Sequence, residues 1–305
     1  MKQTGTKNKS VLKNASLKNA KSLSKAKEGK TIEVKLGATA TLPKLTTKSL
    51  KPFKDIAKKN KKLKAKKKAI SKDFYAKPSR KGKYYNLDLR LRTPESLSII
   101  STSGIKTAPA LARLSKVKGL DYISTADYHD CALVEPLAQA CKETGMGFLP
   151  GVCINCHVTE QSVISNLVLF PEDTTSEYIA NFITDLGIPD SARGSSDYAL
   201  KVDYLAFLKR AEKSGAVVIP SRIDLTPHHL LSIPTLVEKF GFHVFDLAHS
   251  GEPSFFEQRW PKGKFTFFSF SNASSLAQVG SRMSKVKLEK PGFEGLKKLV
   301  KRRKR

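Results

Sequence analysis

Short apolar runs alternate with helix-like segments from Tyr84 onward, and this alternation constrains the fold more than any other feature of the chain. The order βαβα predicts an α/β fold in which helices cover a parallel sheet or barrel. We expect strands at 87–91, 121–125, 147–154, 166–170, 216–220, 243–247 and 265–270. We expect helices at 108–118, 131–144, 203–214, 227–240 and 255–260.

Positive charge gathers at the two ends of the chain, whose formal net charge is +28 over 305 residues. Residues 1–83 hold 27 Lys and Arg against 4 Asp and Glu, a net charge of +23, and residues 297–305 hold 7 basic and no acidic residues. The residues between them hold 21 basic and 23 acidic residues, so they are nearly neutral. We therefore predict a Lys-rich arm at 1–83, an α/β unit at 84–290 and a basic C-terminal tail at 291–305.

The arm is rich in Lys, Ser, Thr, Asn and Ala and poor in large apolar residues. Such a segment cannot bury enough apolar surface to offset the entropy lost on ordering, so we predict that it is mostly disordered. Mobile lysine charges favour sequence-independent contact with phosphates through counterion release. We therefore expect nucleic acid or the ribosome as a partner. The predicted nucleic-acid contacts are Lys58, Lys59, Lys61, Lys62, Lys64, Lys66, Lys67, Lys68, Lys301, Arg302, Arg303 and Arg305.

The chain has no apolar run of about 18 residues, and its first residues never develop an apolar stretch. We therefore expect no signal peptide and no membrane partner. The four cysteines are expected to be reduced thiols. The expected location is cytoplasmic or nucleoid-associated, or nuclear and nucleolar in a eukaryotic cell.

Five segments, in chain order, resemble the metal-site segments of the PHP family, the polymerase and histidinol-phosphatase phosphoesterases. They are 87–95 (LDLRLRTPE), 123–130 (ISTADYHD), 149–154 (LPGVCI), 216–222 (AVVIPSR) and 271–274 (SNAS) followed by Val279 and Gly280. The resemblance implies a distorted (β/α)7 barrel over about residues 84–282. In such barrels the functional side chains lie at the carboxyl ends of the strands.

The chain departs from that family at most positions where the family has a metal ligand. Arg90 and Arg92 stand in place of the two opening histidines, and Cys153 stands in place of a glutamate. Asn272 and Ser274 replace the closing Asp and His. Because a guanidinium cannot coordinate a metal ion, we predict a degenerate PHP-like protein with no cofactor and no hydrolase activity.

The same arginines suit the capture of a phosphate group. Arg90 and Arg92 alternate with leucines along one strand, so they point to the same face, and Arg222 follows a later strand. Guanidinium groups bind phosphate through paired, charge-assisted hydrogen bonds. The alternative is that these arginines form buried structural ion pairs with Asp127, Asp130 or Asp246.

The leading hypothesis is a non-catalytic protein that binds RNA, the ribosome or DNA through its basic ends. One alternative is a phosphoesterase or nuclease that binds Mn, Fe or Zn. Its candidate residues are Asp88, Asp127, His129, Asp246 and His249. A structural zinc site is a further alternative, with Cys153, Cys156 and His157 as ligands. A last alternative is a folded unit that docks a protein partner.

Overall fold

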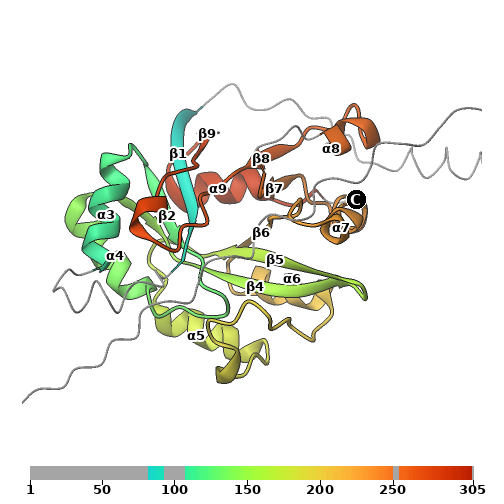
Figure 1. The fold of residues 1–305 in the computed structure, drawn as a ribbon, viewed down its shortest axis with the longest axis horizontal. Helices are drawn as coiled ribbons and strands as arrows, with labels where there is room; N and C mark the ends of the chain where they lie inside the picture. The colour runs from blue at the N-terminus through green and yellow to red at the C-terminus, as the bar shows by residue number, and fades with distance from the viewer. Residues whose placement is uncertain (1–81, 93–106, 250–253, 304–305) are drawn as a thin grey trace, which may run out of the picture. The chain divides into compact units, whose positions relative to one another are not determined.

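The computed structural model describes residues 82–92, 107–249 and 254–303, which belong to the compact unit Lys59–Arg305 (Figure 1). The arm lies outside the described residues as far as residue 81, and so does Arg305. The predicted contacts at 58–68 and the predicted disorder therefore stay predictions. No helix in the described ranges is long and apolar enough to cross a membrane.

The strands of the described residues form two mixed sheets. The first sheet has the order β3 (Gly147–Leu149), β2 (Tyr122–Thr125), β1 (Lys83–Leu91) and β9 (Ser284–Leu288). The second has the order β4 (Gly151–Thr159), β5 (Ser162–Leu169), β6 (Val217–Ser221), β7 (Val244–Asp246) and β8 (Thr266–Phe268). The predicted α/β class is confirmed. The predicted barrel is not found as one closed sheet in these ranges, and the β1–β9, β4–β5 and β5–β6 pairs are antiparallel.

The strand expected at 147–154 is two strands that join different sheets. Pro150 lies between β3 and β4 and has no N–H for a ladder hydrogen bond. Strand β4 then continues to Thr159, and the chain turns over Glu160 and Gln161 into β5. This hairpin makes the pair antiparallel, because a parallel pair would need a long crossover connection.

Two isolated bridges connect the two sheets. Leu91, at the end of β1, lies beside Ala273, and Tyr128, after β2, lies beside Cys153 in β4. The end of β1 therefore meets the chain after β8, and the chain after β2 meets β4. The predicted residues Arg90, Arg92, Asp127 and His129 lie on these segments.

Helices pack around the sheets. They are α3 (Thr107–Val117), α4 (Val134–Thr144), α5 (Ser176–Asp185), α6 (Tyr204–Lys213), α7 (Pro227–Glu238), α8 (Ser254–Arg259) and α9 (Gly292–Val300). Figure 1 shows α3 and α4 side by side next to the first sheet. The N-terminus of α6 is capped by Asp203, whose carboxylate accepts hydrogen bonds from the next turn, and Thr175 caps α5 in the same way. Sequence patterning did not predict α5 or β9.

Helix α9 begins at Gly292 and is not part of a free tail. Its side chains Phe293, Leu296 and Val300 are buried in an apolar cluster to which both sheets contribute. The residues predicted to form a basic tail are therefore part of the folded unit as far as Arg303, because α9 carries a complete apolar face.

Candidate functional site

Three residues with left-handed backbone conformation mark the carboxyl ends of the strands. His129 follows β2, Arg222 follows β6 and Asn272 follows β8, and each has a φ of 52°. Residues other than glycine adopt this conformation rarely, and it is enriched at binding sites. The strand ends are therefore where a functional site is expected.

Arg90 is the centre of this region and its side chain is completely buried. Its Nε donates a hydrogen bond to Oδ1 of Asn272 (2.8 Å), and Nη1 donates to Oγ of Ser221 (2.7 Å). Its Nη2 donates to Oη of Tyr128 (3.3 Å) and to Oγ of Ser165 (3.2 Å). Side chains from β5, from the end of β6 and from the segments after β2 and β8 thus hold one guanidinium in a fixed position.

Ser221 connects Arg90 to the buried Asp246. The Ser221 hydroxyl accepts from Arg90 and donates to Oδ2 of Asp246. Burial lowers the pKa of Arg90, but the neighbouring Cys153 and Tyr128 groups raise it, and the net pKa lies above the usual value. Burial also raises the pKa of Asp246, although the Arg90 charge opposes this shift. The structural role expected for Arg90 with Asp246 is therefore present, through a serine rather than as a direct ion pair.

Asp88 is buried on the same strand as Arg90 and is also fully engaged. Its Oδ1 accepts from the backbone N–H of Ser271 (3.1 Å). Its Oδ2 accepts from the Ser271 hydroxyl (2.5 Å) and from the N–H of Gly280 (3.1 Å). Burial raises the pKa of Asp88 to about 6, although these hydrogen bonds lower it.

Arg92 is half-buried and stacks on the ring of Tyr128, with its guanidinium carbon 4.9 Å from the ring centroid. Its Nε is buried and has no hydrogen-bond acceptor among the described residues. Arg222 is also half-buried, and its pKa is lowered by burial and by the charges of Arg90 and Arg282. We call Arg90, Arg92 and Arg222 the arginine site.

His129 and Asp127 follow β2, and both are buried. The ring of His129 donates from Nε2 to the backbone oxygen of Tyr198 (3.1 Å), and its Nδ1 has no partner among the described residues. Burial lowers the pKa of His129, and the charge of Arg193 lowers it further. The imidazole is therefore neutral and bonded to the segment after α5.

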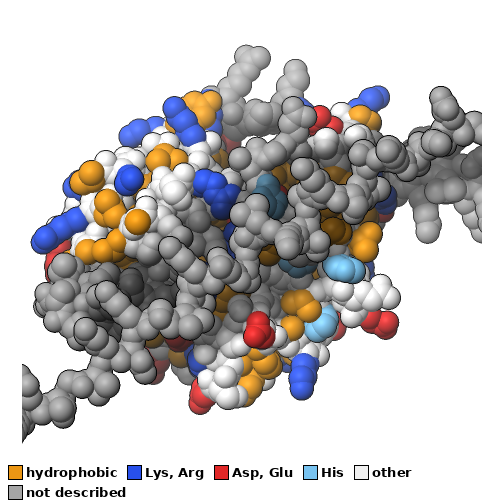
Figure 2. Space-filling view, in the orientation of Figure 1, with side chains coloured by type: hydrophobic (Ala, Val, Ile, Leu, Met, Phe, Trp, Pro, Cys, Tyr) orange, Lys and Arg blue, Asp and Glu red, His pale blue; other side chains and the backbone are white. Residues whose placement is uncertain are grey.

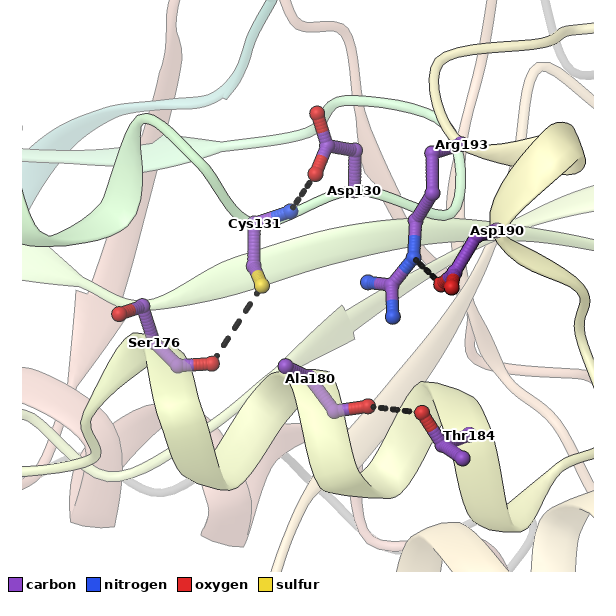
Figure 3. A network of polar contacts seen from close by, with 7 residues as sticks. All are labelled: Asp130, Cys131, Ser176, Ala180, Thr184, Asp190 and Arg193. Carbon is purple, nitrogen blue, oxygen red and sulfur yellow. Dashed lines mark hydrogen bonds and ion pairs between the residues drawn. The ribbon is translucent and has the colours of Figure 1, made fainter.

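Figure 3 shows how the chain after His129 is attached to α5. The Asp130 carboxylate accepts from the backbone N–H of Cys131 (2.8 Å), and the Cys131 thiol donates to the backbone oxygen of Ser176 (3.4 Å). Arg193 forms an ion pair with Asp190 nearby (3.5 Å). Asp130 is one of the residues that the alternative interpretation pairs with the arginines. In the structure its carboxylate instead binds the backbone of its own segment.

The five candidate residues of the enzyme alternative do not fit a metal cluster. Nowhere in the described parts of the chain do three His, Cys, Asp or Glu side chains come together to hold a metal ion. His249 is exposed, and its backbone N–H donates to Asp224 (2.8 Å). Asp88 and Asp246 already accept hydrogen bonds, and Arg90 places a positive charge beside Asp246.

The zinc alternative fails on the geometry of strand β4. Successive side chains of a strand point to opposite faces, so residues three apart cannot share a face. Cys153 and Cys156 accordingly belong to two different apolar clusters, and His157 is exposed. The structure thus separates the three candidate ligands.

The predicted contacts at the C-terminal end lie on the surface of the folded unit. Lys301 is exposed, and Arg302 is 3.4 Å from a carboxylate oxygen of Glu212. Arg303 donates its backbone N–H to Gly241 (3.0 Å). Figure 2 shows Lys, Arg, Asp and Glu side chains on one face, so the folded unit carries charges of both signs.

Sequence reasoning did not identify the hydroxyl groups that hold the buried charges. Ser221 and Ser271 lie in segments that resemble the PHP family, but the sequence assigns no role to them or to Ser165. A serine carries no sequence signal for bonding to a residue more than 100 positions away, as Ser221 does with Arg90 and Ser271 does with Asp88. Position is a signal for Ser221 and Ser271, which lie at or after strand ends, whereas Ser165 lies within β5.

No protein-family model matches the chain, and no curated protein matches it. Among solved structures, it is similar to a putative metal-dependent phosphoesterase from Bifidobacterium adolescentis, with 13% identity and a TM-score of 0.43. That match covers 68% of this chain and 94% of the other. An amidohydrolase from Chromobacterium violaceum matches with 9% identity and a TM-score of 0.37, over 50% of this chain and 72% of the other. Both names describe enzymes. At these values the similarity assigns no activity to this chain.

Proposed function

We propose that this protein binds nucleic acid without cleaving it, and that the arginine site holds one phosphate of the bound strand. The lysines of the arm supply most of the affinity, because each neutralised phosphate releases counterions. The arginine site adds a fixed contact that positions the strand.

The observation that carries this proposal is the state of Arg92. A buried N–H without an acceptor costs free energy, and a phosphate oxygen is a strong acceptor for it. Arg92 Nε is such a group, and its guanidinium contacts the ring of Tyr128. Arg92 is thus poised to donate to an anion.

The charge balance around Arg92 also favours an anion. Arg222 lies close enough to Arg90 and Arg282 for their charges to lower its pKa. The nearby carboxylates are engaged elsewhere, since Asp246 is bonded to Ser221 and Asp88 to Ser271. A phosphate group would relieve the repulsion among these arginines.

We also propose that the two sheets are an opened form of a PHP-like barrel. The two isolated bridges support this, because they complete a ring of strands in the order β1, β2, β4, β5, β6, β7, β8 and back to β1. A ring of seven strands is what the resemblance to the PHP family implies.

The test compares Arg92→Gln with a matched control, Arg113→Gln, on the exposed face of α3. Binding of a fluorescent single-stranded RNA and of its DNA equivalent is measured by anisotropy over a range of salt concentrations. We expect Arg92→Gln to weaken binding by about tenfold and to reduce the salt slope by about one. Arg113→Gln should change neither value. Equal behaviour of the two variants would refute the role of the arginine site.

The second candidate function is a metal-dependent phosphoesterase or nuclease. The observation in its favour is the pair of buried carboxylates with raised pKa, Asp88 and Asp246, since such groups are enriched at catalytic sites. Metal analysis of the purified protein, together with hydrolysis assays in Mn, Fe and Zn, tests it. Turnover of an oligonucleotide that Asp246→Asn abolishes would establish this function instead.

A further inference from the structure

A groove of about 710 Å³ lies at the start of β6, at the opposite end of that strand from Ser221. Its walls come from α6, from the residues just after α7, and from α9 with the segment that follows it. Seven Lys and Arg residues line it against two Glu. No residue of the arginine site lines the groove, so it is a separate surface with a strong positive charge.

The floor of the groove is aliphatic. Ala216 and Val218 are half-buried there, and Leu208, Val217 and Val300 complete the apolar lining. Exposed aliphatic surface in a groove gains free energy when apolar side chains cover it. An apolar floor inside a polar, charged rim is the usual arrangement of a protein-binding surface.

The rim side chains already bind carboxylates of this chain. Arg302 pairs with Glu212 at 3.4 Å, and Lys297 is 3.8 Å from Glu294. Lys301 and Lys290 are exposed and form no ion pair with the described residues. The rim can therefore accept additional carboxylates.

A nucleic acid fits this groove less well than a peptide does. Bases bind to exposed aromatic rings, and the aromatic residue of the lining is Phe240. Phe240 is only 5% exposed, and the Lys239 ammonium lies 5.2 Å from its ring centroid. The floor thus offers aliphatic contacts and no stacking surface.

We propose that the groove binds an acidic peptide segment of a protein partner. Its carboxylates contact the rim lysines, and its apolar side chains lie on the floor formed by Ala216 and Val218. This surface uses neither the arm nor the arginine site, and it assigns Lys301, Arg302 and Arg303, which the sequence suggests as nucleic-acid contacts, to a protein partner instead.

The experiment uses the full chain and a short fluorescent peptide that alternates Asp or Glu with Val or Leu. A poly-Glu peptide of the same length serves as the comparison without apolar side chains. The arm is the same in every variant, so its contribution to peptide binding cancels when the variants are compared. We expect Lys301→Glu to weaken peptide binding by about fivefold or more. The control Lys142→Glu makes the same charge change on α4, outside the groove, and should leave binding unchanged. A photoreactive version of the peptide should cross-link to groove residues.

A second variant tests the floor. Val218→Ser should weaken the mixed peptide but not the poly-Glu peptide, since only the mixed peptide has apolar side chains; a thermal melt checks that the variant is folded. Equal binding by Lys301→Glu and Lys142→Glu overturns the proposal. So does a result in which Lys301→Glu weakens an oligonucleotide and leaves the peptide unchanged, because the groove would then be a nucleic-acid surface.

Discussion

Arg90 shows how this chain buries a full positive charge. Its guanidinium is linked through the Ser221 hydroxyl to Asp246, and three further acceptors come from β5 and from the segments after β2 and β8. A buried charged side chain is tolerated only when its hydrogen-bonding groups are satisfied. Removal of one charge of a buried pair leaves the opposite charge uncompensated. Arg90 therefore has a structural role in addition to any contact with a ligand.

A double-mutant cycle measures this linkage. We expect Arg90→Met alone to reduce the free energy of unfolding by about 3–5 kcal/mol, because Asp246 then stays buried without its cation. The double variant Arg90→Met with Asp246→Leu should cost less than the sum of the single variants. Urea unfolding at pH 7 provides the values. Strictly additive losses would show that the serine does not couple the two residues.

His243 provides a pH dependence whose sign is fixed by its surroundings. Its Nε2 donates to the backbone oxygen of Leu299 (3.1 Å). Burial and the charge of Arg303 lower the pKa of His243 to about 4, whereas an unfolded histidine titrates near 6.5. Its contribution to stability is complete above about pH 6.5 and is lost as the pH falls toward 4.

We predict that His243→Gln removes this pH dependence. Between pH 6.5 and pH 5 the wild type should lose about 2 kcal/mol more stability than the variant. Asp88 acts in the opposite direction, since its raised pKa of about 6 adds stability below that pH. The Asp88 contribution cancels when the stability of the variant is subtracted from that of the wild type, because both proteins contain Asp88. Parallel stability curves from urea unfolding at several pH values would contradict the prediction.

At the scale of elements, helix α9 connects the C-terminal residues to both sheets through the apolar cluster that contains Leu296. We expect Leu296→Ala to cost about 2–5 kcal/mol in urea unfolding, as for other fully buried leucines. The neighbouring Lys297→Ala, on the exposed side, should cost less than about 1 kcal/mol. Deletion of residues 291–305 should abolish folding. A folded deletion variant would show that these residues are a dispensable tail.

The sequence predicts most of the elements but not how the strands pair. Runs such as 216–220 are apolar and flanked by turn residues, so β6 was expected within one residue. The pairing depends on long-range contacts, and one proline divides β3 from β4. Strand β9 was missed because Lys285 and Lys287 interrupt its apolar residues, an arrangement that suits a strand at the edge of a sheet. The hydroxyl groups around Arg90 were missed because they, too, come from residues far from Arg90 in the sequence.

At the scale of the whole molecule, most of the net positive charge lies in the arm, and residues 84–296 are nearly neutral. We predict that removal of residues 1–81 weakens nucleic-acid binding strongly and reduces its dependence on salt, because most phosphate contacts are lost. The thermal melting temperature should stay the same, since β1 begins at Lys83. Anisotropy titrations over a range of salt concentrations and a thermal melt test both statements. Unchanged salt dependence would place the binding surface on the folded unit.

Strand β1 pairs with β2 on one side and, on the other, with β9, which follows about 200 residues later in the chain. During synthesis on the ribosome, the first sheet therefore cannot be completed until almost all of the chain has emerged. The lysine-rich residues that precede β1 leave the exit tunnel long before that moment. At that stage they can already meet polyanions, including the RNA of the ribosome itself, whereas the arginine site has not yet formed.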